Sequence, residues 1–268
     1  MGYFAGAFFS ETLQMTTQLG VILPQDAPEY KEKKKKPKTL ILLHGLGDNY
    51  QAWITRTSVL RYAEQYGVAV LMPEVCRSWY ADMRYGRNYF TYITKELPEY
   101  ASAVFHISVK PEDCMIAGLS MGGYGALKCG LTYPEKYMGI GAFSAAWEIE
   151  DHVLQQNIGN SFDKTEIEKD SFSIFGAERK IPETCDIRAL LEKADRSQSR
   201  PFIYLVCGKE DFLYNSNVKL KQMFEKSKQN CKYSEMTGEH EWKVWDKAIQ
   251  YFLAYIIDGK IPKECIDE

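Results

Sequence analysis

The sequence predicts an α/β protein built on a mainly parallel, doubly wound sheet. Short apolar runs recur along the chain and end at turn residues, as strands that are buried on both faces do. Segments with helical spacing separate these runs, and this alternation is typical of parallel strands joined by crossover helices. The 268 residues are enough for one such domain, with a core that needs no disulfides.

Apolar runs bounded by turn residues predict the strands, and the segments between them predict the helices. The expected strands cover residues 12–23, 39–43, 68–72, 113–117, 138–143, 202–207 and 231–236. The expected helices cover residues 53–66, 89–105, 122–132, 215–227 and 242–257. Pro24 and Pro73 end the first and third strands, and Pro98 should kink the second helix. Glycine-rich turns follow the strands that end at residues 43, 117 and 207.

The stretch from Trp147 to Arg200 interrupts this alternation. It contains no strand-like run, and helical and loop signals alternate within it. Because it lies between two expected strands, it should rise over the carboxyl edge of the sheet, where open α/β folds bind their ligands. No linker rich in Pro, Gly or Ser flanks it. We therefore expect residues 1–268 to form a single domain with a cap insertion over about residues 147–200.

Composition excludes several classes of function. The 33 basic and 36 acidic residues give a net charge of −3. Nucleic-acid-binding proteins usually carry a strong excess of basic residues, so this function is not expected. The lysine-rich run over residues 29–37 is interpreted as a solvated hairpin loop, and the alternative is a patch for an anionic partner. No apolar run approaches the roughly 18 residues of a membrane-spanning helix, so no membrane partner is expected.

The cysteines predict a reducing compartment. They are Cys76, Cys114, Cys129, Cys185, Cys207, Cys231 and Cys265. Their number is odd, no two form a C-x-x-C pair, and several lie inside apolar runs. We therefore expect reduced, buried thiols in a cytoplasmic protein. The apolar start of the chain lacks the positively charged region of a signal peptide.

The sharpest motif is Gly118-Leu-Ser120-Met-Gly122, which matches G-x-S-x-G. A predicted strand precedes it and a predicted helix follows it, as the motif requires. The glycines allow a tight, strained turn that exposes the serine, and the N-terminus of the next helix points at it. We interpret Ser120 as a nucleophile; the alternative is a glycine-rich packing turn with a passive serine.

A serine nucleophile needs a base, and the chain has only four histidines: His44, His106, His152 and His240. Where the nucleophile follows a strand in this way, the acid and then the histidine come later in the chain. Only His152 and His240 do so. His152 lies in the expected cap, whereas His240 follows the last expected strand, and we predict His240 as the base.

The expected acid follows the strand that ends at residue 207. Both Glu210 and Asp211 are available there, and Asp211 precedes an apolar turn. We predict Asp211 as the residue that holds the imidazole tautomer and stabilises the imidazolium, with Glu210 as an exposed neighbour. The alternative for Asp211 is a helix N-cap.

The oxyanion hole should consist of two backbone N–H groups. One should be that of Met121, directly after the nucleophile, and the other should come from the loop after residue 43. We choose Leu46, with Gly45 or Gly47 as alternatives, and expect His44 to order this loop. No metal or other cofactor is expected, because the zinc-motif-like sequence that starts at His240 has valine where the second histidine belongs.

Taken together and in order, these motifs resemble the esterase D group of the α/β-hydrolase superfamily, and the tributyrin esterases within it. The resemblance runs from about residue 8 to residue 257. It rests on His44-Gly-Leu-Gly-Asp-Asn49, Trp53, Ser78-Trp-Tyr-Ala-Asp82, Glu96-Leu-Pro98, Gly118-Leu-Ser-Met-Gly-Gly-Tyr-Gly125, Phe143-Ser144, Cys207-Gly-Lys-Glu-Asp-Phe-Leu213 and Gly238-Glu-His-Glu-Trp242. It implies an α/β-hydrolase fold, hydrolysis of short-chain acyl esters through an acyl-serine, and a triad of Ser120, Asp211 and His240.

The expected function is therefore that of a serine carboxylesterase acting on acetyl or butyryl esters, including those of carbohydrates. An S-formylglutathione hydrolase of the same group is the main alternative, an acyltransferase is a lesser one, and a non-catalytic binding protein with this fold is the alternative from another class. Four aromatic residues near the motifs, Trp79, Tyr80, Trp147 and Trp242, are candidates to line the acyl pocket, although aromatic residues also dominate cores. A homo-oligomer is compatible with the sequence.

Overall fold

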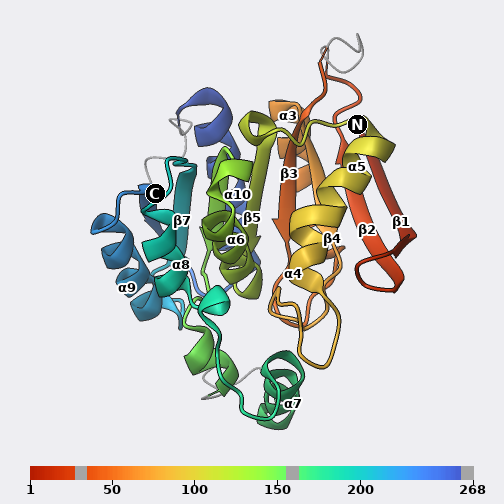
Figure 1. Cartoon of the computed structure of the whole chain (residues 1–268). Coiled ribbons are helices and arrows are strands. Elements are labelled where there is room, and N and C mark those ends of the chain that lie inside the picture. The colour runs from red at the N-terminus through yellow and green to blue at the C-terminus, as the bar shows by residue number, and fades with distance from the viewer. Residues whose placement is uncertain (28–34, 155–162, 261–268) are drawn as a thin grey trace.

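The computed structural model describes residues 1–27, 35–154 and 163–260, which form an eight-stranded sheet (Figure 1). The strands are β1 (Gly2–Ser10), β2 (Met15–Leu23), β3 (Lys38–Leu43), β4 (Val68–Pro73), β5 (Cys114–Leu119), β6 (Gly139–Phe143), β7 (Phe202–Gly208) and β8 (Asn230–Met236). Their order in the sheet is β1-β2-β4-β3-β5-β6-β7-β8. The strands from β4 to β8 in this order are parallel, whereas β1 and β2 are antiparallel. This confirms the α/β-hydrolase fold and its mainly parallel sheet.

Helices cover both faces of the sheet. They are α2 (Ala52–Arg56), α3 (Val59–Tyr66), α4 (Tyr89–Thr91), α5 (Leu97–Phe105), α6 (Met121–Thr132), α7 (Lys164–Phe175), α8 (Ile187–Ala194), α9 (Tyr214–Glu225) and α10 (Trp242–Asp258), with the short turns η1 (Tyr92–Glu96), η2 (Pro111–Asp113), η3 (Pro134–Lys136), η4 (Glu150–Leu154) and η5 (Glu183–Cys185). Each predicted strand and helix overlaps an observed element. The sequence did not predict β1.

Successive residues of the central strands enter two separate cores, because side chains alternate across a strand. Leu40 and Leu42 of β3 pack with α3 and α10 on one face. Ile41 and Leu43 pack on the other face, where α5, α6 and α8 lie (Figure 1). Two buried faces explain why these strands read as continuous apolar runs.

The kink predicted at Pro98 is a π-helical turn, η1, that immediately precedes α5. Pro98 has no N–H to donate to the carbonyl oxygen of Thr94, four residues earlier. The ammonium group of Lys136, from the turn before β6, donates to that oxygen instead at 2.9 Å. The helix therefore changes its winding where its own backbone cannot supply a hydrogen bond.

The expected cap is an insertion between β6 and β7, and no strand occurs in its described residues, 147–154 and 163–200. Helix α7 lies beyond the carboxyl ends of the strands (Figure 1). It is held to the loop after β4 by hydrogen bonds from the N–H groups of Arg84 and Tyr85 to carbonyl oxygens of its last turn, both at 2.9 Å. Helix α8, although inside the range predicted as cap, packs against α6 in the helical layer.

Several expectations about the surface can be compared with the described residues. The lysine-rich run lies largely outside them, and its last two lysines, Lys35 and Lys36, are exposed. All six described cysteines are free; four are buried, Cys231 is half-buried and Cys76 is exposed, while Cys265 lies outside the described residues. Within the described part of the chain, no helix is long and apolar enough to cross a membrane.

The turn between β1 and β2 depends on one carboxylate, that of Glu96 in η1. It accepts hydrogen bonds from the Ser10 hydroxyl at 2.6 Å and from the N–H groups of Glu11 and Thr12 at 2.8 and 3.1 Å. Burial opposes its charge, but the hydrogen bonds from Ser10, Thr12 and Glu11 outweigh burial and hold the pKa of Glu96 below its usual 4.5.

We predict that Glu96→Gln lowers the free energy of unfolding by about 1–2 kcal/mol at pH 7, because a charged acceptor of three hydrogen bonds becomes a neutral one. The lowered pKa belongs to the folded state, so this stabilisation is present above about pH 4.5 and is lost as the pH falls through the folded pKa. Urea unfolding at a series of pH values should show the difference from the wild type shrinking below about pH 4.5. Glu192→Gln, at an exposed position on α8, should change stability by less than about 0.5 kcal/mol; an equal loss in both variants would contradict the prediction.

Candidate active site

Ser120 lies at the sharp turn between β5 and α6 with a positive backbone φ of 53° and a ψ of −117°. This conformation is strained for an L-residue, and it persists only where the surroundings hold it. The Ser120 N–H donates to the carbonyl oxygen of Phe143 at 2.9 Å, and its own carbonyl accepts from Tyr124 and Ala146 at 3.0 and 3.2 Å. Backbone groups on both sides of the turn therefore hold the serine.

The two glycines of the motif are required by close backbone contacts. A Cβ on Gly118 would lie 2.5 Å from the backbone of Gly122, and a Cβ on Gly122 would lie 2.5 Å from the carbonyl oxygen of Leu43 in β3. Neither contact can relax by moving a flexible side chain. The turn thus packs directly on the end of the neighbouring strand, and this explains the G-x-S-x-G spacing.

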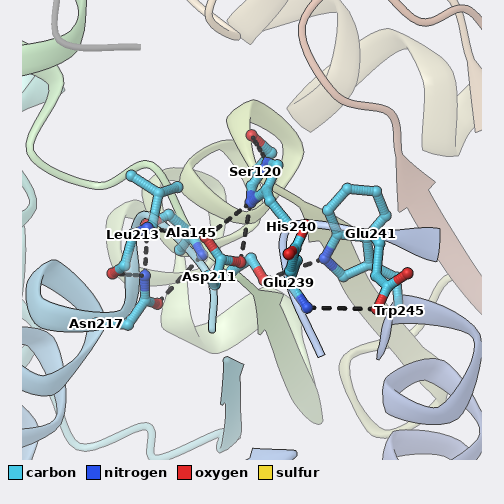
Figure 2. A network of polar contacts seen from close by, with 10 residues as sticks. Ser120, Ala145, Asp211, Leu213, Asn217, Glu239, His240, Glu241 and Trp245 are labelled. Carbon is cyan, nitrogen blue, oxygen red and sulfur yellow. Dashed lines mark hydrogen bonds and ion pairs between the residues drawn. The ribbon is translucent and has the colours of Figure 1, made fainter. Parts of the chain in front are cut away.

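His240 connects Ser120 to Asp211, as Figure 2 shows. Its Nε2 lies 3.0 Å from the Ser120 Oγ, and its Nδ1 lies 2.9 and 3.1 Å from the two carboxylate oxygens of Asp211. A carboxylate only accepts, so Nδ1 carries the proton and Nε2 is free to accept from the serine hydroxyl. The structure therefore brings together the three residues that the sequence predicted.

Asp211 is buried, and its charge is supported by hydrogen bonds. Burial raises its pKa, but the hydrogen bonds and charge of His240, the N–H of Leu213 and the hydroxyl of Ser144 outweigh this and hold the pKa below its usual 3.8. Asp211 is therefore ionised at neutral pH.

Glu210, the other predicted candidate, has a different role. It is exposed, and its carboxylate accepts the N–H of Gly238 at 2.6 Å, while its own N–H donates to the carbonyl of Gly238 at 3.2 Å. A Cβ on Gly208 would lie 2.1 Å from the same carbonyl oxygen. The loop that carries His240 thus lies directly against the loop that carries Asp211, and Glu210 holds the two together.

Three buried residues whose supporting contacts the sequence did not predict hold this arrangement: Asn217, Ser144 and Trp245. The side chain of Asn217 in α9 accepts the N–H of Ala145 and donates to the carbonyls of Ala145 and Leu213, at 3.0–3.2 Å. Trp245 of α10 donates through Nε1 to the hydroxyl of Ser144 at 3.1 Å, and Ser144 in turn contacts Asp211. In the sequence, only the resemblance to the esterase D group points to Ser144, and no motif or spacing points to Asn217 or Trp245.

The glycine-rich loop after β3 lies beside Ser120. A Cβ built on Gly45 would lie 3.8 Å from the Cβ of Ser120. His44 is buried and orders this loop: its Nδ1 donates to the carbonyl of Gly45 at 2.8 Å, and its Nε2 accepts the N–H of Val75 at 3.2 Å. The expectation that His44 is structural agrees with these contacts. Leu46 follows in the same loop, and Met121 is the first residue of α6, whose initial N–H groups have no acceptor within the helix.

Of the four aromatic residues expected to line a pocket, the structure buries three in the core. Trp79 stacks on His152, with ring centroids 6.1 Å apart; the Tyr80 hydroxyl donates to the carbonyl of His44 at 2.8 Å; and the Trp147 indole donates to the carbonyl of Ser216 at 2.9 Å. These side chains have almost no surface left for a ligand. Trp242 is half-buried.

The aromatic side chains that contact the histidine are different ones. Trp245 meets the His240 ring edge-on, with centroids 4.9 Å apart, and Phe212 lies 4.7 Å away. Phe212 is 54% exposed, so it lies at the surface beside His240. Trp242 stacks edge-on against Trp245. Phe212 was not among the predicted pocket residues.

The remaining histidines lie elsewhere. His106 ends α5 at an exposed position, and His152 is buried beside Trp79. Among residues 1–27, 35–154 and 163–260, no group of three or more His, Cys, Asp or Glu side chains is placed to hold a metal ion.

Comparison with known proteins agrees with the fold. The protein family described as "Putative esterase" matches residues 10–256. An acetyl esterase from Caldicellulosiruptor saccharolyticus is 34% identical over 253 residues, which are 90% of this chain and 93% of that one. The substrate-bound structure of the fluorophosphonate-binding serine hydrolase F of Staphylococcus aureus is 34% identical, with a TM-score of 0.83 over 96% of this chain and 98% of that one. The S-formylglutathione hydrolase of the same organism, as the apoenzyme, is 32% identical, with a TM-score of 0.82 and the same coverage.

The fold and these relatives define a serine ester hydrolase of the α/β-hydrolase superfamily. The chain belongs to the esterase family that matches residues 10–256.

We predict that Asn217→Ala lowers the free energy of unfolding by about 2–4 kcal/mol, because it removes three hydrogen bonds and leaves buried backbone groups without partners. Chemical unfolding followed by circular dichroism measures this. Asn215→Ala, two residues earlier on the same helix but exposed, should stay within about 0.5 kcal/mol of the wild type. Equal stability of the two variants would show that Asn217 does not hold the backbone at Ala145 and Leu213.

Proposed function

We propose that Ser120, His240 and Asp211 are the catalytic residues of this esterase. The observation that carries the proposal is the unbroken chain of hydrogen bonds from the serine hydroxyl through the imidazole to a buried, ionised carboxylate. A serine hydroxyl is a weak nucleophile on its own, and this arrangement removes its proton as it attacks.

The proposed reaction has two halves. The Ser120 Oγ attacks the ester carbonyl carbon while its proton passes to Nε2 of His240, and Asp211 stabilises the resulting imidazolium. His240 then gives the proton to the leaving alcohol oxygen as the carbon–oxygen bond breaks, which leaves an acyl-serine. A water molecule repeats the sequence, with His240 as base and then as acid, and releases the carboxylic acid.

We assign the oxyanion hole to the N–H groups of Met121 and Leu46. Met121 is supported by its position in the first turn of α6, where the N–H groups and the helix dipole favour negative charge. Leu46 is supported by the contact between its loop and Ser120 at Gly45. Backbone donors at fixed positions stabilise the tetrahedral intermediate without reorganising.

The proposed substrates are short-chain acyl esters of the acetyl or butyryl type, including esters of carbohydrate alcohols. The relative named as an acetyl esterase supports this class. Phe212 and Trp242 are the aromatic residues that we propose to contact the substrate, because Phe212 is exposed beside His240 and Trp242 is half-buried next to Trp245. Rates with p-nitrophenyl esters of increasing acyl length would measure the depth of the pocket.

A second candidate is S-formylglutathione hydrolysis, which would use the same serine on a thioester. It is favoured by the 32% identity to a protein of that name over nearly the whole of both chains. The ratio of kcat/KM for S-formylglutathione to that for p-nitrophenyl acetate and tributyrin decides between them. A ratio well above one would assign the thioester as the substrate.

We further propose that the protein works in the cytoplasm. Six free thiols in the described residues, one of them exposed, support a reducing compartment. Fractionation of cells with an antibody to the protein tests this placement.

We predict that Ser120→Ala keeps the fold and lowers the turnover of p-nitrophenyl acetate by about 10⁴–10⁶-fold, because the nucleophile is lost. A fluorophosphonate probe should label the wild type and not this variant, with Ser173→Ala as a labelled and active control. Near-native turnover by Ser120→Ala would exclude the assignment, and an unlabelled, inactive wild type would favour a non-catalytic binding protein.

Adjacent carboxylates allow a matched test of the acid. Asp211→Asn should lower kcat by about 10⁴-fold, because an amide can no longer hold the Nδ1–H tautomer or stabilise the imidazolium. Glu210→Gln removes a charge one residue away but keeps an acceptor for the Gly238 N–H, and it should lose less than about tenfold. If the two variants lose activity equally, the role of Asp211 is wrong.

A further inference from the structure

The outer edge of β1 is available for pairing. β1 lies at the end of the sheet and pairs with β2 on one side; within the described residues, no strand pairs with its other side (Figure 1). The strand spans nine residues, so it presents a long row of backbone N–H and C=O groups outwards. Such an edge is a template for a further strand unless the protein blocks it.

None of the usual blocking devices is present in β1. Residues 2–10 contain no charged residue and no proline. Phe4 and Phe9 are 47% and 55% exposed, and with Met15 of β2 they make up three of the seven large apolar side chains that are exposed in the described residues. An exposed apolar edge of this kind predicts association.

The opposite edge of the same sheet is protected. β8 carries Lys232 and the exposed Glu235 within its seven residues. Charges on an edge strand prevent pairing with another strand. Because β8 carries charges and β1 carries none, the contrast indicates that a further strand pairs with the outer edge of β1.

The sequence of β1 indicates the occupant, because it is self-complementary. Read outwards from Gly6 in either direction, it runs alanine, aromatic, aromatic, small: Ala5, Phe4, Tyr3, Gly2 on one side and Ala7, Phe8, Phe9, Ser10 on the other. In an antiparallel pair of two β1 strands centred on Gly6, each residue of a class therefore meets a residue of the same class. A two-fold interface requires this self-complementarity.

We propose that the protein forms a two-fold symmetric dimer in which β1 pairs antiparallel with β1 of a second copy about Gly6. The two eight-stranded sheets then become one continuous sheet. Side chains that alternate across a strand keep their face in this register, so Phe4 of each copy lies beside Phe8 of the other, and Tyr3 beside Phe9. Phe8 already stacks on Tyr100 of α5, with ring centroids 3.9 Å apart, so the pairing extends an existing aromatic cluster.

Gly6 suits the centre of such an interface. A Cβ built at Gly6 would meet nothing within 4 Å in the isolated chain, so the glycine is not required by contacts within the protein. At the two-fold axis its backbone lies opposite that of the second copy.

The first experiment measures mass by light scattering during size-exclusion chromatography over a range of concentrations. The wild type should elute with twice the chain mass of 30.8 kDa. Ala7→Lys, which places a charge on the exposed edge, should shift the protein to a single chain mass, while circular dichroism and esterase activity show that it is folded. Val104→Lys, at a side chain that is 54% exposed on α5, is the matched control and should remain a dimer.

Three outcomes overturn the proposal. A wild type of single chain mass at about 50 μM means that the edge is unoccupied or binds a different partner. A dimer that persists in Ala7→Lys, or one that is lost equally in Val104→Lys, places the interface elsewhere.

A second experiment tests the register by disulfide trapping. In the proposed dimer Gly6 faces itself, with Cα atoms about 4.5–5.5 Å apart, which is within disulfide range. The two copies of residue 4 lie four residues apart along the strands, at about 13 Å. Mild oxidation should therefore cross-link Gly6→Cys and not Phe4→Cys, with the wild type oxidised in parallel because Cys76 is exposed. Equal cross-linking of the two variants, or none in Gly6→Cys, contradicts the register.

Discussion

The positive-φ backbone of Ser120 is the constraint on which the site depends. It is held because the turn after β5 packs on the end of β3 at Gly122 and bonds to the end of β6 at Phe143. Parallel strands end at one edge, so Ser120 after β5, Asp211 after β7 and His240 after β8 all emerge there. The strained turn can persist because its neighbours are central strands buried on both faces, which are the most stable part of such a fold.

The polar groups around the site form a second level of support. Asn217 and Trp245 come from the two helices that flank β8 in sequence, and each bonds to the segment after β6 rather than to the histidine. Their bonds fix the segment after β6, and the Ser144 hydroxyl in this segment contacts Asp211 in the loop after β7. The geometry of the serine and histidine is therefore maintained by packing between helices and strand ends, and not by the three central residues alone.

The sheet and the three central residues could be predicted from the sequence because each residue follows a predicted strand and chain order favours one histidine. It missed β1, because glycine, alanine and phenylalanine on both faces give no alternation of apolar and polar residues. It could not separate core from pocket for Trp79 and Trp147, since their burial depends on partners distant in the chain. The kink at Pro98 followed from its missing N–H, but the compensating Lys136 is visible only in three dimensions.

The position of His240 in the chain has a consequence for biosynthesis. The turn at Ser120 is held by β3, β5 and β6, whereas His240 lies in the loop after β8 and Trp245 lies in α10. The ribosome releases the chain from its N-terminus and a domain generally folds as a unit, so a nascent chain carries Ser120 before it carries the imidazole that the proposed mechanism needs. In the proposed mechanism Ser120 therefore stays inactive during synthesis, and hydrolysis begins only after the elements that follow β8 have docked.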